Sequence, residues 1–259
     1  MDKEARLKEL FKRWIGCKRC PLHEKRRNIV FGQGNPDADI LVIGIGPGEE
    51  EDKTGNPFWG PSGDILDEFL AKNKYSRGDL FLLNIVACRP TAEVLDPVTK
   101  RKKIDNRDPA PIERASCQEL WLSTLYIVDP MLIVALGKPA VAELSKQRGI
   151  QMYKEHGKII DCELPGLVVP IRYPVMTMYH PAFLARSGDK TYGGVWHQAL
   201  VDWRRAIYYV DQLRYIYYGE KPLDRGFDRL GLFINTETLE EKEEQLCQEE
   251  QHQEERDET

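Results

Sequence analysis

The chain has 259 residues, of which 41% are hydrophobic and 31% are charged, a composition typical of a soluble globular protein. No apolar run approaches the roughly 20 residues of a membrane-spanning helix, and the charged N-terminal segment lacks the apolar core of a secretory signal. These observations favour a cytoplasmic protein and exclude a membrane partner. Charge is uneven: residues 237–259 hold 11 acidic and 2 basic side chains, whereas residues 1–236 hold 31 acidic and 35 basic ones.

The charge pattern predicts one mildly basic domain over residues 1–220 and an acidic tail over 221–259, either disordered or a solvated helix. Apolar spacing predicts a helix over 3–15, and an apolar run at 40–43 predicts a buried strand. Further elements expected in chain order are a helix at 62–73, a strand at 80–86, a long exposed loop at 91–110, a helix at 111–127, a strand at 131–136, a helix at 138–148, short edge strands within 150–178 and a long helix at about 194–217. This alternation predicts an α/β fold with a largely parallel sheet.

The strand at 40–43 leads into a glycine-rich loop at 44–48, which four acidic residues and then Phe58-Trp59 follow. Glycines let the backbone approach a ligand closely. A strand that ends in glycines and acids at the top of a sheet is where α/β proteins usually bind ligands. A tight turn with solvated acidic side chains is the competing interpretation, and this stretch alone does not decide between them.

Four cysteines indicate a metal centre. Cys17 and Cys20 form a C-x2-C pair, Cys88 follows the strand at 80–86, and Cys117 lies early in a predicted helix. In a reducing cytosol such residues favour metal or redox chemistry over disulfides. Four thiolates suit either tetrahedral zinc or a cubane iron–sulfur cluster, and spacing alone does not choose.

Seven motifs, in one order over roughly residues 10–210, resemble those of the iron–sulfur uracil-DNA glycosylases, family 4. They are CKRCPL, FGQGNPDADILVIG, the glycine loop through GNPF, LNIVACRP, SCQELWL, IVALGKPAV and YHPAFLAR. The resemblance implies a three-layer α/β/α fold around a central, mostly parallel four-stranded sheet. It also implies a structural [4Fe–4S] cluster bound by Cys17, Cys20, Cys88 and Cys117.

The activity that the resemblance implies is extrusion of a uracil, the product of cytosine deamination, from DNA, followed by hydrolysis of its N-glycosidic bond to leave an abasic site. Phe58 would stack on the base, Asn84 would pair with O4 and N3–H, and Glu51 would exclude a methyl group at C5. His180 would donate to O2 and stabilise the charge that develops on the leaving base. The remaining implied base-binding residues are Ile45, Gly46, Pro47 and Gly48.

Implied DNA contacts surround this pocket. Leu184 and Arg186 would belong to a loop that wedges into the duplex. Ser62, Lys102 and Lys103 would contact the backbone, although charge runs of this size are usually solvated surface. We expect a monomer, with a protein partner as one possible role for the acidic tail.

Three departures from the family pattern leave alternatives open. Ile45 stands where family members usually carry a glutamate that can orient water. The insertion at 91–105 contains a basic run that ends in Asp105, so the covalent histidine of a related glycosylase has no counterpart. The tail is the third departure. The alternatives are a glycosylase for a modified pyrimidine, in phage DNA defence or modification, and a DNA-binding member with weakened catalysis.

Overall fold

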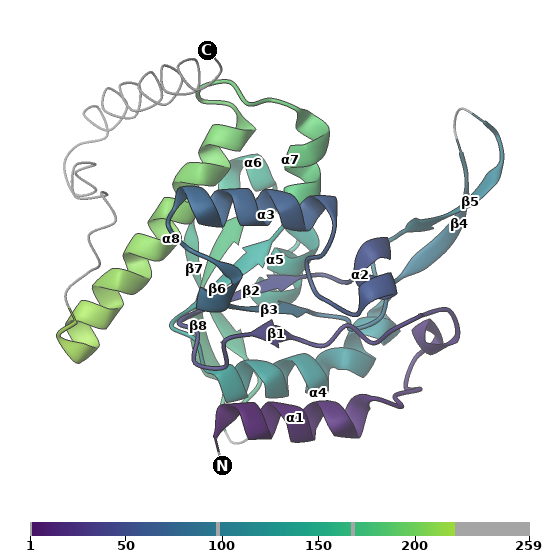
Figure 1. Ribbon diagram of the computed structural model, residues 1–259, viewed down its shortest axis with the longest axis horizontal. Coiled ribbons are helices and arrows are strands. Elements are labelled where there is room, and N and C mark those ends of the chain that lie inside the picture. Colours follow the sequence, from purple (N-terminus) through teal and green to yellow (C-terminus); the bar gives the residue numbers. More distant parts are fainter. Residues whose placement is uncertain (1, 97–98, 167–168, 221–259) are drawn as a thin grey trace.

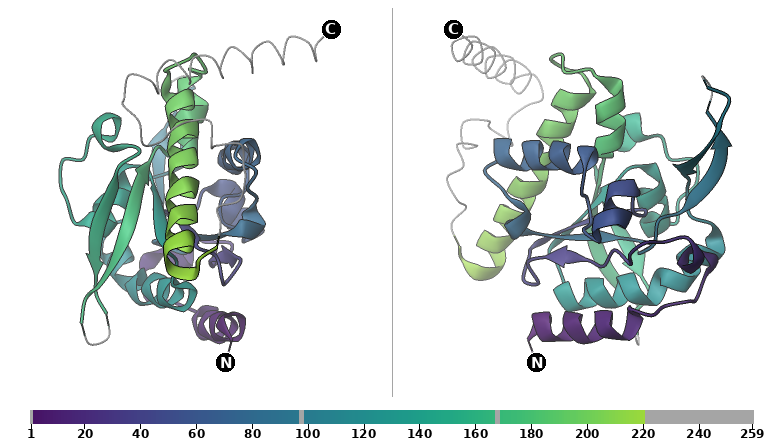
Figure 2. Two further views of the ribbon diagram at one scale, coloured as in Figure 1. Left: turned by 90° about the vertical axis from the view of Figure 1, so that its left-hand side faces the viewer. Right: turned by 45° about the vertical axis from the view of Figure 1, so that its right-hand side comes forward.

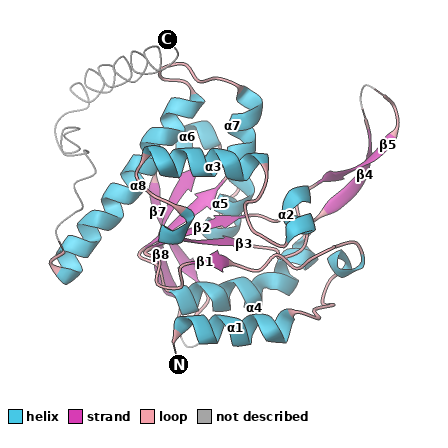
Figure 3. Ribbon diagram, viewed as in Figure 1, coloured by secondary structure: helices cyan, strands magenta, loops and turns pink. Residues whose placement is uncertain are grey.

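The computed structural model describes residues 2–96, 99–166 and 169–220, which form three layers with a six-stranded sheet between two groups of helices (Figure 1). The predicted acidic tail lies outside the described residues. No helix within these ranges is both long and apolar enough to cross a membrane. Figure 3 shows helices on both sides of the sheet, as expected for an α/β protein.

The helices and strands have the following bounds. The helices are α1 (Lys3–Trp14), α2 (Glu49–Thr54), α3 (Pro61–Lys72), α4 (Pro111–Val128), α5 (Lys138–Ser145), α6 (Met152–Glu155), α7 (Pro181–Ser187) and α8 (Val195–Tyr218), with 3-10 turns at Pro21–Glu24 and Arg77–Asp79. The strands are β1 (Gln33–Gly34), β2 (Ile40–Gly44), β3 (Leu80–Asn84), β4 (Thr91–Leu95), β5 (Lys102–Asn106), β6 (Leu132–Leu136), β7 (Ile159–Leu164) and β8 (Ile171–Met178).

The sheet has the order β1-β3-β2-β6-β8-β7. Its four central strands are parallel, and β1 and β7 pair antiparallel at the two edges. The predicted four-stranded, mostly parallel sheet is thus the centre of a wider mixed one. A two-residue edge strand such as β1 carries too little pattern to be detected from sequence.

Alternate residues of the central strands pack on opposite faces of the sheet. Leu41 and Ile43 belong to one core cluster with apolar side chains of α1, α4 and α5, whereas Ile40 and Val42 belong to a second cluster with α3 and α8. Every residue of β2 is buried. Burial on both faces explains why these strands appear in the sequence as continuous apolar runs.

Two segments predicted as loops are ordered elements. Within 91–110, β4 and β5 pair as an antiparallel ribbon that projects from the body (Figures 1 and 2). The acidic stretch forms α2, because the Glu51 carboxylate accepts from the Gly48 N–H at 2.6 Å and acidic side chains suit the first turn of a helix.

Candidate active site

The carboxyl ends of β2, β3 and β8 surround a pocket of about 710 Å³. Gly44 at the end of β2 is paired in register with Asn84 at the end of β3, and His180 follows β8. This is the edge of a parallel sheet at which α/β proteins bind ligands. Ten of the predicted residues line the pocket: Ile45, Gly46, Pro47, Gly48, Glu51, Phe58, Ser62, Asn84, His180 and Arg186.

The Glu51 carboxylate connects three walls of the pocket. One oxygen accepts from the Gly48 N–H at 2.6 Å, and the other accepts from the Phe58 N–H at 2.7 Å and from Asn84 Nδ2 at 3.3 Å. Burial raises the pKa of Glu51, and these three hydrogen bonds oppose the rise. Glu51 therefore orients the glycine loop, the Phe58 backbone and the Asn84 amide together.

Phe58 is held in a strained conformation. Its φ of 51° is in the left-handed region, which non-glycine residues rarely adopt, and its side chain is buried. Arg77 Nη2 donates to the Phe58 carbonyl at 2.6 Å, while Glu51 accepts from its N–H. A Cβ on Gly63 would lie 2.0 Å from that carbonyl oxygen, so only glycine permits this approach. The ring is thus positioned through contacts on both sides of its own backbone.

The Asn84 side chain lies beside Gly44, buried and in a fixed orientation. A Cβ on Gly44 would be 2.6 Å from Asn84 Oδ1 and 3.0 Å from the Phe58 ring. Since Nδ2 donates one hydrogen to Glu51, the amide retains one donor and an acceptor. That pair of groups matches the O4 and N3–H edge of uracil.

His180 is a neutral hydrogen-bond donor. The Ala182 N–H donates to Nδ1 at 3.1 Å, where His180 caps α7. Burial and, to a smaller extent, the nearby Arg186 together lower the pKa of His180 to about 4. Because Nδ1 is an acceptor, the proton of the neutral ring is on Nε2. Gly137, at φ 82°, packs beneath this residue, where a Cβ would lie 3.0 Å from that of His180.

The glycine loop faces the pocket and also packs against the segment that follows β3. A Cβ on Gly46 would lie 2.7 Å from Val86 Cγ2, so close packing accounts for this glycine. Ile45 lines the pocket and also packs against the core cluster on the α1 and α4 side of the sheet. The pocket wall at this position is therefore aliphatic, as the sequence of the glycine loop predicts.

Leu184 does not have the exposure that its predicted role requires. Residues 181–187 form α7 rather than a loop, and Leu184 on its inner face is only 1% exposed. Phe183 and Arg186 lie on the outer face, and the Phe183 side chain is 40% exposed. Helical periodicity turns Leu184 into the core, so the wedge role predicted for it would require α7 to rearrange on DNA.

The base of the β4–β5 ribbon borders the pocket. Arg89 Nε donates to Asn106 Oδ1 at 2.7 Å, and Arg89 Nη2 contacts a Glu49 carboxylate oxygen at 3.3 Å. Asn106, Arg107 and Asp108 all line the pocket. Lys102 and Lys103, further along the ribbon, are exposed and are not among its lining residues.

The four predicted metal ligands lie on the side of the sheet that α1, α4 and α5 cover. Cys88 and Cys117 are buried in the core cluster there, and Cys17 and Cys20 pack against it. Burial raises the pKa of Cys117 to about 12, and the other three thiols add to the rise. Arg26 Nη1 lies 3.4 Å from Cys88 Sγ. Among the described residues, no group of three or more His, Cys, Asp or Glu side chains has the arrangement expected around a single metal ion.

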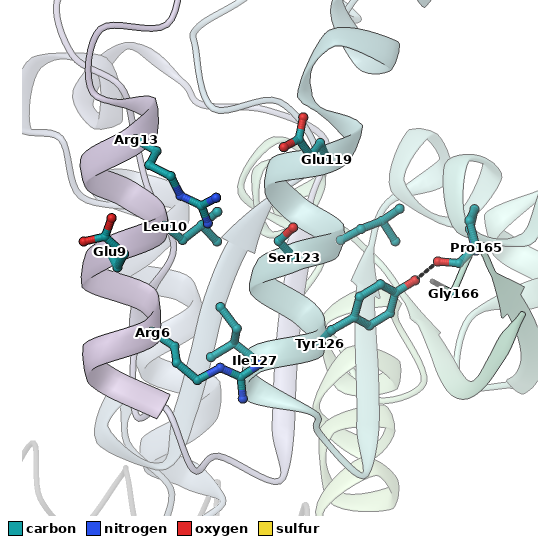
Figure 4. A pocket seen from close by; sticks show the side chains of 11 residues that line it. Arg6, Glu9, Leu10, Arg13, Glu119, Ser123, Tyr126, Ile127, Pro165 and Gly166 are labelled. Atoms are coloured by element: carbon teal, nitrogen blue, oxygen red, sulfur yellow. Dashed lines mark hydrogen bonds between the residues drawn. The ribbon is translucent and has the colours of Figure 1, made fainter. Parts of the chain in front are cut away.

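A second pocket, of about 460 Å³, lies between α1, α4 and the end of β7 (Figure 4). The Tyr126 hydroxyl donates to the Pro165 carbonyl at one side, and Arg6 and Arg13 extend from α1 at the other. None of the predicted site residues lines it. The candidate active site is therefore the pocket at the carboxyl ends of the strands.

Comparison with known proteins identifies the family. Residues 31–201 match the model of the Uracil DNA glycosylase superfamily. The chain is 37% identical to a type-4 uracil-DNA glycosylase of Thermotoga maritima over 171 residues, which is 66% of this chain and 79% of the relative. It is 33% identical to that of Pyrobaculum aerophilum, over 70% of this chain and 84% of the relative, and 32% identical to that of Archaeoglobus fulgidus, over 68% and 81%.

The chain belongs to the Uracil DNA glycosylase superfamily. Within that superfamily it belongs with the type-4 group.

Three residues that shape the site are not predicted by the sequence patterns. Arg77 and Gly63 act on the Phe58 backbone from 19 and 5 positions away, and Asn106 reaches the pocket from the ribbon. Arg77 belongs to a short polar turn with no distinguishing pattern. Gly63, in the first helical turn after Pro61, offered a signal, because glycine within a helix is costly unless close packing requires it.

Proposed function

We propose that this protein removes uracil from DNA by hydrolysing its N-glycosidic bond, which leaves an abasic site. One observation carries the proposal: a neutral His180 donor and the Asn84 amide lie in one pocket with the buried Phe58 ring. The type-4 relatives, named as uracil-DNA glycosylases, support the same reaction. The protein would act on DNA as a monomer in the cytoplasm.

Recognition of the base follows from the fixed amide. Asn84 would donate its free Nδ2 hydrogen to O4 and accept from N3–H, whereas cytosine presents a donor and an acceptor in the reverse order. Phe58 would stack on the planar ring. Glu51 would border C5 and would also act as a positioning residue, since its hydrogen bonds orient the other two.

Bond cleavage places the electron pair of the N1–C1′ bond on the uracil, and water adds to C1′ with loss of a proton to solvent. The charge on the departing base spreads onto O2, where the Nε2–H of His180 would donate a hydrogen bond. Ile45 would exclude bulk water from the sugar without orienting the attacking molecule. Activity therefore depends on stabilisation of the leaving base.

The direct test is release of the base from oligonucleotides that carry a single uracil, a thymine mismatch or a modified pyrimidine, followed by alkaline cleavage at abasic sites. We expect cleavage at uracil, in single or double strands. Ile45 favours a second candidate, a modified pyrimidine, because a pocket wall without the carboxylate offers apolar surface to a substituent. Absence of cleavage on every substrate, with DNA binding retained, would contradict both.

We further propose that Cys17, Cys20, Cys88 and Cys117 bind a [4Fe–4S] cluster. The four thiols suit such a group because three segments of the chain bring them to the same side of the sheet, near enough for Cys17, Cys20 and Cys88 to raise the pKa of Cys117. Bound there, the cluster would join the N-terminal region to α4 and to the segment after β3 without taking part in the reaction. Thiolate ligation would also overcome the burial that now raises the pKa of Cys20, Cys88 and Cys117.

Substitution Cys88→Ser should remove most of the bound iron and the brown colour of the purified protein, because one thiolate ligand is lost. Iron content per chain and visible absorption are the measurements. Cys162→Ser is the matched control, since Cys162 is equally buried, in β7, but outside the set. Equal iron content in the two variants, or stoichiometric zinc in place of iron, would contradict the assignment.

We propose that Phe183, rather than Leu184, enters the duplex where the nucleotide leaves it. Phe183→Ser should lower kcat/KM on duplex uracil DNA by about tenfold, the effect of losing an aromatic contact of roughly 1.4 kcal/mol. Activity on single-stranded DNA should change little. Ala185→Ser, on the exposed part of the same helix, is the control. Equal losses on single and double strands would remove Phe183 from this role.

A further inference from the structure

The β4–β5 ribbon has two chemically different faces. Cross-strand pairing puts Leu95 opposite Lys102, Glu93 opposite Ile104 and Thr91 opposite Asn106, and side chains of directly paired residues lie on the same side of a ribbon. We call these six residues the pocket-side face. The alternate pairs, Ala92 with Asp105 and Val94 with Lys103, form the opposite face.

Contacts at the base of the ribbon show which face adjoins the pocket. Asn106 lines the pocket, and its amide lies near Gly48 on the glycine loop, 3.8 Å from where a Cβ would be. Arg89, two positions before Thr91 and so on the same side, bridges Asn106 and Glu49. A molecule seated at the mouth of the pocket would therefore continue onto this face.

The pocket-side face exposes apolar side chains that no part of the described chain covers. Leu95 is 66% exposed and Ile104 is 53% exposed, whereas Ala92 and Val94 on the opposite face are partly buried. Large aliphatic side chains left open on a projecting ribbon indicate a surface that is covered on binding.

The basic side chains of the ribbon are also distributed between its two faces. Lys103, on the opposite face, lies 3.1 Å from Asp105 and 3.9 Å from Asp96. Lys102, on the pocket-side face, contacts one carboxylate, that of Glu93, at 2.6 Å. Residues 100–103 are all basic, so the outer part of the ribbon suits a polyanion.

We propose that the pocket-side face docks in a groove of duplex DNA beside the extruded nucleotide. A two-stranded ribbon fits the major groove, where aliphatic side chains contact thymine methyl groups and lysine reaches phosphates. Continuity with the pocket and the basic outer part favour DNA over a second copy of this chain. The inference rests on the proposed function only in placing duplex DNA at the pocket mouth. Lys102 and Lys103, although adjacent in the chain, would then have different roles.

The test measures binding to a uracil-free duplex by fluorescence anisotropy over a range of salt concentrations. The double variant Leu95→Ser/Ile104→Ser should raise Kd by about tenfold through lost apolar contact. Lys102→Gln should reduce the slope of log K against log salt by about one, as for one lost phosphate contact. Lys103→Gln is the matched control and should leave the slope unchanged. Since these side chains lie outside the core clusters, thermal unfolding should not change.

Three results would overturn the inference: unaltered duplex binding by the double variant, equal slopes for the two lysine variants, or dissociation of a dimer by the double variant in size-exclusion chromatography. Uracil release from a strand too short to reach the ribbon measures the pocket separately from the ribbon. Since the anisotropy assay uses no uracil, a wild-type protein that releases none would contradict the proposed function while leaving the ribbon testable.

Discussion

His180→Ala should lower kcat for uracil release by roughly 10²–10³, a loss of about 2.7–4 kcal/mol of transition-state stabilisation. The reason is that the Nε2–H, oriented by the Ala182 N–H on Nδ1, is the donor that faces the charge on the departing base. KM for duplex should change much less than kcat. Single-turnover kinetics of the wild type and the variant make the comparison, and His197→Ala, at a ring that does not line the pocket, is the control. Full activity in His180→Ala would remove His180 from the reaction.

The pH profile provides an independent test of the same residue. Because burial lowers the pKa of His180 to about 4, the ring stays neutral through the neutral range and gains a proton only as pH falls toward that value. The rate should therefore show no titration near the ordinary histidine pKa of about 6.5. An NMR titration of the ring should find the same low pKa, and Arg186→Gln should raise it. A titration near 6.5 would show that the ring is not buried as described.

Asn84→Asp should lower the ratio of kcat/KM for uracil over cytosine by on the order of 10³, because the carboxylate offers no donor to O4 and can accept from the cytosine amino group. The new carboxylate would also lie beside Glu51 Oε1, which is now 3.3 Å from Asn84 Nδ2. Repulsion between the two would raise the pKa of both groups. Steady-state kinetics on uracil and cytosine duplexes make the measurement.

The double variant Asn84→Asp/Glu51→Gln distinguishes recognition from repulsion. Repulsion between the two carboxylates should lower the thermal stability of Asn84→Asp. A glutamine at 51 can donate to the new carboxylate, so the double variant should regain thermal stability while uracil preference stays lost. Glu51→Gln alone is the control. Restored uracil preference in the double variant would mean that repulsion from Glu51, rather than loss of the Asn84 donor, had caused the change in preference.

The central sheet was predictable because its physical cause is local. Strands buried on both faces must be apolar throughout, so the apolar runs at 40–43, 80–86 and 131–136 can be recognised as strands from the sequence. The ribbon was not predictable in the same way. Its strands stand away from the core, so burial imposes no apolar alternation on β5, and the charged segment resembles a solvated loop.

The site was predictable where a residue follows a strand, and not where it depends on packing between distant segments. Asn84 and His180 end or follow strands at the same edge of the sheet, and both line the pocket. No sequence pattern indicates that Arg77 binds the Phe58 carbonyl or that α7 turns Leu184 inward. Those facts depend on the packing of the completed fold.

The two hydrogen bonds that hold the Phe58 backbone have a consequence for how substrate preference can change. Glu51 and Arg77 both act on the peptide groups of this residue and neither holds the ring. The left-handed backbone is therefore maintained whatever aromatic group it carries. Exchange of the ring for another aromatic group would change the surface that meets the base without changing these two hydrogen bonds. Because the ring is buried beside Gly44, only a group of similar size would fit without loss of stability.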